Sequence, residues 1–125
     1  MSEIDHHAPI FVVDDDPDLR EILGDLLQDE GYEPFLFANG QPALELLQSG
    51  ARPHLILLDL MMPEMNGWQF REQQLRDASL RDIPVVVMTA STGVDTGALR
   101  ASEILKKPVG IEEILEAVER HVLRS

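Results

Sequence analysis

The sequence alternates short runs of consecutive apolar residues with segments in which apolar residues recur at helical spacing. Within each run the apolar residues are consecutive, which is typical of strands buried on both faces. Turn-forming or acidic residues bound the clearest runs, such as Ile10–Val13 with three aspartates after it. The pattern predicts five strands, at residues 10–13, 33–37, 54–58, 84–89 and 103–106.

The segments between these runs have apolar residues three and four positions apart, which indicates amphipathic helices. The first helix has Asp16 as a suitable N-cap, Pro17 at its first position and Gly31 as its stop. The third has a thin apolar face, which only Trp68, Phe70 and Leu75 supply. The other helices are predicted at about residues 40–49, 98–101 and 110–123, and the third at 67–77.

Five strand–helix repeats indicate an α/β protein with a parallel sheet covered on both faces. Right-handed crossover connections leave few topologies for such a sheet. A common solution is the flavodoxin-like doubly wound sheet with strand order 2-1-3-4-5, which places the first and third strands side by side. We therefore expect their carboxyl ends to share one edge of the sheet.

Composition narrows the class of protein further. The length of 125 residues suits one domain, predicted at 9–125 after a flexible lead at 1–8. The absence of cysteine excludes disulfides and thiolate metal sites. Neither a signal-peptide core nor a membrane-spanning apolar run occurs, so we expect a cytoplasmic protein without a membrane partner. The net charge of −13 disfavours direct nucleic-acid binding and favours a hard cation or a basic protein surface.

Chemically active residues stand at the ends of four predicted strands. Asp14 and Asp15 follow the first strand, Asp59 follows the third, Thr89 ends the fourth and Lys107 follows the fifth. Carboxylates brought together repel one another, and a hard cation such as Mg²⁺ removes that conflict. A carboxylate, a metal pocket, a hydroxyl and an ammonium are the groups that phosphoryl transfer onto an aspartate needs. Each residue alone also fits an ordinary structural role, but their joint placement favours the site.

Four stretches of the chain resemble one known family. FVVDDDPDLREIL, LILLDLMMPEMNGW, VVVMTA and LKKP are similar to the receiver domains of response regulators in two-component signalling, over about residues 9–123. The resemblance implies that Asp59 is the phosphorylated aspartate and also a ligand of the Mg²⁺ ion. It makes Asp14 and Asp15 the acidic pair of an Mg²⁺ site, with Asp15 the direct ligand. The backbone carbonyl of Met61 matches the remaining protein ligand, and the two residues that contact the phosphoryl group match Thr89 and Lys107.

The same resemblance implies a function and its partners. A phosphoryl group passes from a phosphohistidine to Asp59 in an Mg²⁺-dependent reaction, and this changes contacts with other proteins. The donor is a sensor histidine kinase or a histidine phosphotransfer protein, while the output protein is not specified. Such a domain catalyses its own phosphorylation and dephosphorylation, but it is not a turnover enzyme on a separate substrate. The bond between Lys107 and Pro108 is often cis in this family.

The sequence departs from the family around its usual output face. Ile104 stands where the family often has a switch aromatic, Arg100 where it often has glycine, and Val109 where it often has phenylalanine. The interval from Thr89 to Lys107 is shorter than usual by about four residues, which is one helical turn. We therefore expect a shortened fourth helix.

Rival functions stay open at this level. An aspartyl-phosphate hydrolase would also use Asp, Thr and Lys, but it usually has a second acid where this chain has Met61. A flavin carrier would need a hydroxyl-rich phosphate loop in place of the three aspartates that follow the first strand. A third alternative is an adaptor that has the same fold and binds a partner without ever being phosphorylated. The chain is either a single-domain regulator or a receiver excised from a longer protein.

Overall fold

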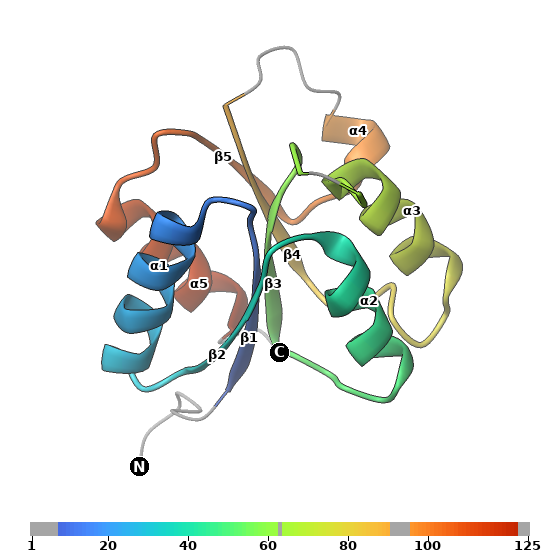
Figure 1. Ribbon diagram of the computed structural model, residues 1–125, viewed down its shortest axis with the longest axis horizontal. Coiled ribbons are helices and arrows are strands. Elements are labelled where there is room, and N and C mark those ends of the chain that lie inside the picture. Colours follow the sequence, from blue (N-terminus) through green and yellow to red (C-terminus); the bar gives the residue numbers. More distant parts are fainter. Residues whose placement is uncertain (1–7, 63, 91–95, 123–125) are drawn as a thin grey trace.

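A parallel sheet forms the centre of the computed structural model, which describes residues 8–62, 64–90 and 96–122 (Figure 1). Its strands pair in parallel in the order β2-β1-β3-β4-β5. The flavodoxin-like order predicted from the sequence is therefore confirmed, with β1 and β3 adjacent. The strands are β1 (Pro9–Val13), β2 (Glu33–Phe37), β3 (Leu55–Asp59), β4 (Val85–Thr89) and β5 (Glu103–Lys106).

Helices cover both faces of the sheet, with α1 and α5 on one side and α2, α3 and α4 on the other (Figure 1). In the described segments, α4 is a single turn of four residues, whereas the other helices have nine or more. The predicted shortening of the fourth helix is thus confirmed. None of the described helices is long and apolar enough to cross a membrane. Their bounds are α1 (Pro17–Asp29), α2 (Gly40–Gln48), α3 (Gly67–Arg76), α4 (Thr96–Leu99) and α5 (Ile111–Val122).

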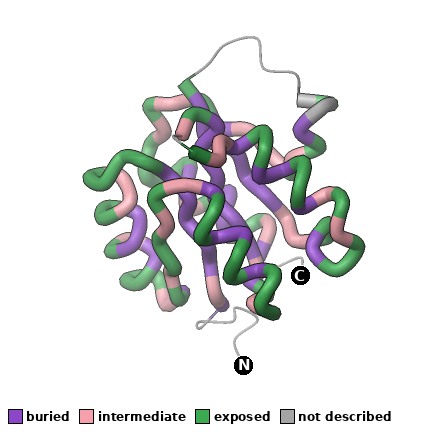
Figure 2. The backbone as a smooth tube through the Cα atoms, turned by 45° about the vertical axis from the view of Figure 1, so that its right-hand side comes forward, coloured by how far each residue is buried: buried purple, intermediate pink, exposed green. Residues whose placement is uncertain are grey.

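The central strands are buried along almost their whole length, because helices pack on both sides of them (Figure 2). All five residues of β3 and of β4 are buried. Ala8, which the sequence analysis placed in the lead, is fully buried and its carbonyl accepts a hydrogen bond from the Glu33 amide. The rest of that predicted lead, residues 1–7, lies outside the described residues.

The apolar face predicted for α3 is wrong in part. Phe70 is fully buried, but Trp68 is 38% exposed and Leu75 is half-buried. The buried face continues instead through two polar side chains, Arg71 and Gln74. Within the described residues, no other helix buries a polar side chain.

Candidate functional site

Three carboxylates meet at the carboxyl ends of β1 and β3. Val13 and Leu58 are partners in the register of the two strands, so Asp14 follows β1 beside Asp59, the last residue of β3. One carboxylate oxygen each of Asp14, Asp15 and Asp59 lie within 4.8 Å of one another. The structure thus brings together the acidic residues that the sequence analysis assigned to a metal site.

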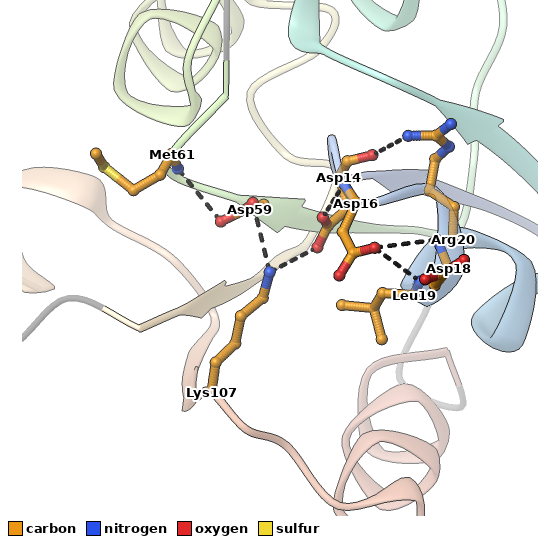
Figure 3. A network of polar contacts seen from close by, with 8 residues as sticks. All are labelled: Asp14, Asp16, Asp18, Leu19, Arg20, Asp59, Met61 and Lys107. Carbon is orange, nitrogen blue, oxygen red and sulfur yellow. Dashed lines mark hydrogen bonds and ion pairs between the residues drawn. The ribbon is translucent and has the colours of Figure 1, made fainter.

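The two aspartates after β1 have different surroundings. Asp14 is fully buried, and its Oδ1 accepts a hydrogen bond of 2.9 Å from the Asp16 amide (Figure 3). Its backbone carbonyl accepts another, of 2.7 Å, from Nη1 of Arg20. Asp15 is exposed, and within the described part of the chain its carboxylate makes no hydrogen bond or ion pair. Asp15 is therefore the carboxylate that can turn toward a cation at the lowest cost.

Lys107 places its ammonium group between the two buried carboxylates (Figure 3). Nζ lies 2.9 Å from Oδ2 of Asp14 and 3.4 Å from Oδ2 of Asp59. Burial by itself lowers the pKa of Lys107, but the hydrogen bonds and negative charges of Asp14 and Asp59 outweigh it and raise that pKa. Lys107 therefore stays charged beside Asp59.

Asp59 has a higher pKa than an ordinary aspartate. Burial, followed by the charge of Asp14, raises the pKa of Asp59 from 3.8 to about 6. Lys107 and the Met61 amide, whose N–H donates to Oδ1 over 3.2 Å, oppose that shift. The ionised carboxylate is the nucleophilic form, and any cation placed among these oxygens would favour it.

The turn after Asp59 is fixed by close backbone packing at the start of α3. The Gly67 amide donates a hydrogen bond of 3.0 Å to the Leu60 carbonyl. A Cβ at position 67 would lie 2.7 Å from both the Asp59 carbonyl oxygen and the Leu60 Cα. Only glycine fits such an approach without displacing the backbone. Gly67 thus helps to hold Met61 and Asp59 in place.

The other predicted site residues lie at the same edge of the sheet. Thr89 is the last residue of β4 and is fully buried, and its carbonyl accepts a hydrogen bond of 2.9 Å from the Lys107 amide. The peptide bond between Lys107 and Pro108 is cis, as the family resemblance led us to expect. Asp16 is the N-cap of α1, accepting from the amides of Asp18 and Leu19, and is not part of the carboxylate cluster.

The donor atoms of the cluster fit a hard cation. They are oxygens with a net negative charge, which is the ligand type that Mg²⁺ prefers. One contributor at this edge was missed in the sequence: Arg20, whose guanidinium fixes the backbone beside Asp14. Its position one turn into α1 offers a weak signal, because an arginine there usually faces water.

Comparison with known proteins identifies the family to which the chain belongs. The sequence model of one protein family, the response regulator receiver domain, matches residues 10–119 of the chain. The chain belongs to this family. It is a receiver domain, the phosphoryl-accepting signalling module of two-component systems.

Curated relatives of the chain are response regulators of different lengths. The DNA-binding response regulator MtrA of Mycolicibacterium smegmatis is 34% identical over 123 residues, covering 93% of this chain and 51% of the relative. Sporulation initiation phosphotransferase F of Bacillus subtilis is 34% identical over 118 residues, covering 90% of this chain and 92% of the relative. The chain spans about half the length of several relatives, including MtrA.

Solved structures of other receiver proteins match the fold closely. The chemotaxis protein CheY4 of Vibrio cholerae has a TM-score of 0.83 and 30% identity, covering 92% of this chain and 98% of that one. The response regulator TrrA of Thermotoga maritima, in complex with Mg²⁺-BeF, has a TM-score of 0.77 and 32% identity. This match covers 90% of the present chain and 97% of TrrA.

Proposed function

We propose that Asp59 is the residue that accepts the phosphoryl group, in an Mg²⁺-dependent transfer from a phosphohistidine. One observation carries this assignment: the nearly buried Asp59 lies within 4.8 Å of two further carboxylates and 3.4 Å from the Lys107 ammonium. Like charges in such proximity favour a bound cation, and an ammonium beside the acceptor neutralises the oxygens of an incoming phosphoryl group.

Each residue has a separate task in the proposed transfer. A carboxylate oxygen of Asp59 attacks phosphorus in line with the bond to the histidine nitrogen. The new P–O bond forms as the P–N bond breaks, and the electron pair of that bond leaves with the imidazole ring. Lys107 then contacts a phosphoryl oxygen, and the Thr89 hydroxyl donates a hydrogen bond to another.

Mg²⁺ would be held by Asp15, Asp59 and the Met61 backbone carbonyl. Asp14 is already paired with Lys107 and completes the acidic pair. It would support the ion with its negative charge without binding it directly. When bound, the ion supplies positive charge to the phosphoryl oxygens during transfer. Support for this metal comes from the oxygen donors of the cluster and from the Mg²⁺-BeF complex of the related TrrA.

The donor protein would dock at a cavity beside the acceptor. A cavity of about 430 Å³ adjoins Lys107, and its walls include Leu19, Val109 and the 51%-exposed Ile22. An apolar cavity bordering charged residues suits the helical surface of a sensor histidine kinase or a phosphotransfer protein. The output protein is not specified. The net charge of −13 disfavours direct binding to nucleic acid, and action in the cytoplasm stays a prediction.

Phosphorylation of matched variants tests the assignment. Purified chain, incubated with Mg²⁺ and acetyl phosphate, should gain one phosphoryl group by intact-mass measurement, and hydroxylamine should release it as it does other acyl phosphates. Asp59→Asn should gain none. Asp16→Asn is the matched control, because asparagine also caps helices well, and it should label like the wild type.

Two results would count against the proposal. Full labelling of Asp59→Asn would assign the acceptor to another residue. A wild-type chain that takes no label from acetyl phosphate or from a phosphohistidine donor would favour the adaptor function instead.

A further inference from the structure

A second cavity lies at the opposite end of the sheet from the carboxylate cluster. It has a volume of about 360 Å³ and reaches the amino ends of β4 and β5, at Pro84 and Ser102. The chain as a whole has 23 acidic residues against 10 lysines and arginines, yet this cavity gathers basic ones. Its ionisable lining residues are Arg71, Arg81, Arg100, His121 and Asp82.

Arg71 brings a buried positive charge to the cavity. Only 4% of this residue is exposed, and its guanidinium bonds are all to neutral acceptors. Nε donates to the Leu99 carbonyl over 2.9 Å, Nη2 to the Arg100 carbonyl over 2.7 Å, and Nη1 to the Gln74 side-chain oxygen over 2.7 Å. In the described part of the chain no carboxylate forms an ion pair with it, so the charge is uncompensated.

Arg100 adds a second positive charge under backbone strain. Its φ of 52° is left-handed, a conformation that non-glycine residues adopt at a cost. Its exposed side chain lies on the wall of the cavity, and its carbonyl is held by Arg71. Burial, and then the charge of Arg100, lowers the pKa of Arg71, so the two guanidinium groups repel each other. Strained residues of this kind cluster at binding sites.

The rest of the lining does not cancel these charges. Arg81 is exposed on the same wall, and Asp82 forms no ion pair in the segments that the structure describes. His121 is already paired with Glu103 over 3.0 Å. Three arginines, from α3, the segment before β4 and the turn before β5, therefore line one cavity whose lining residues include a single carboxylate.

We propose that this cavity binds a small oxyanion with two or more negative charges, of the phosphate-monoester or polycarboxylate class. Arginine forks bind both groups through paired charge-assisted hydrogen bonds. A bound anion would compensate Arg71, relieve its repulsion with Arg100, and hold the carboxyl end of α4 more firmly on α3. The site is separate from the acceptor aspartate, and its ligand need not be phosphorylated by or from Asp59.

Titration of the full chain, followed by backbone amide signals in NMR, tests the proposal. Inorganic phosphate and citrate are added separately, at constant pH and ionic strength and without Mg²⁺, with sodium chloride as the blank. We expect saturating shifts at Arg81, Arg100 and Ser102. Saturation by phosphate alone or by citrate alone would support the site and narrow the ligand class.

Variants of the exposed arginines localise the site without touching the buried one. Arg81→Gln and Arg100→Gln should each weaken binding by about tenfold or more, because each removes charge-assisted hydrogen bonds. Arg76→Gln is the matched control: Arg76 is 69% exposed on α3, is not part of this cavity, and should leave affinity unchanged. Shifts that never saturate, that occur only around Asp59, or that are equal in all variants would overturn the proposal.

Discussion

Two buried charged clusters in this receiver domain are built in opposite ways. At the carboxyl ends of the strands, the Lys107 ammonium pairs with the carboxylates of Asp14 and Asp59. Negative charges outnumber positive ones there, because Asp15 lies nearby. Between α3 and α4, the Arg71 guanidinium is surrounded by carbonyl and amide oxygens instead. The charge of the first cluster can therefore change with pH, as the raised pKa of Asp59 indicates, whereas the second cluster ties α3 to the end of α4.

The difference follows from what each group can do when it is buried. A carboxylate can escape the cost of burial by taking up a proton or a cation, so its state depends on conditions. A guanidinium keeps its charge at all ordinary pH values, so the protein must supply acceptors for it permanently. Gln74 completes this second arrangement, since its Nε2 donates to the carbonyls of Leu80 and Ile83.

The largest expected effect comes from removing the exposed carboxylate of the first cluster. Asp15→Ala should abolish Mg²⁺-dependent phosphorylation while leaving the fold intact. Loss of an outer-shell partner costs about 10–100-fold in metal affinity, and a direct ligand should cost at least that. Calorimetric titration with Mg²⁺ measures the affinity. Asp25→Ala, an equal charge change at an exposed position of α1, is the control, and an unchanged affinity in Asp15→Ala would contradict the assignment.

Breaking the second cluster should affect stability and not the chemistry of Asp59. Arg71→Met leaves the carbonyls of Leu99 and Arg100 without their donor, so we expect a loss of about 2–4 kcal/mol in unfolding free energy. Urea denaturation measures this loss.

The neighbouring Arg76 provides the contrast on the same helix. Its ion pair with Glu72 is exposed and 3.3 Å long, so Arg76→Met should cost no more than about 0.5 kcal/mol. Equal losses in the two variants would mean that burial of Arg71 does not decide its contribution.

A gain in stability that depends on pH is expected from Asp59→Asn. Because the pKa of Asp59 in the folded chain is about 6, above its ordinary 3.8, the folded state holds the proton more tightly than the unfolded state. Stability from the neutral carboxyl is present in full below about pH 4 and is lost as the pH rises through about 6. Asparagine stays neutral, so this variant should be more stable than wild type by about 1–2 kcal/mol at pH 8, allowing for partial solvation at the rim.

Urea denaturation between pH 4 and 8 measures that gain. It should shrink as the pH falls through about 6 and vanish near 4. A difference between variant and wild type that is constant across this range would show that ionisation of Asp59 is not the cause.

Sequence alone determined the strands, their order and which polar residues stand at their carboxyl ends. Runs such as Ile10–Val13 are local signals, and parallel strands necessarily carry Asp14, Asp59 and Lys107 to one edge of the sheet. The N-cap at Asp16 was likewise readable, because capping depends on neighbouring amides only.

Tertiary structure alone decided which polar residues are buried and what satisfies them. The sequence places Arg71 on a helix with few apolar residues, where an arginine usually faces water, but two of its three acceptors lie 28 and 29 positions further along the chain. The different surroundings of Asp14 and Asp15 depend in the same way on Lys107, which bonds to Asp14 from 93 residues away. Sequence spacing gives periodicity and caps, whereas the partner of a buried charge is set by which distant backbone and side-chain atoms the fold brings against it.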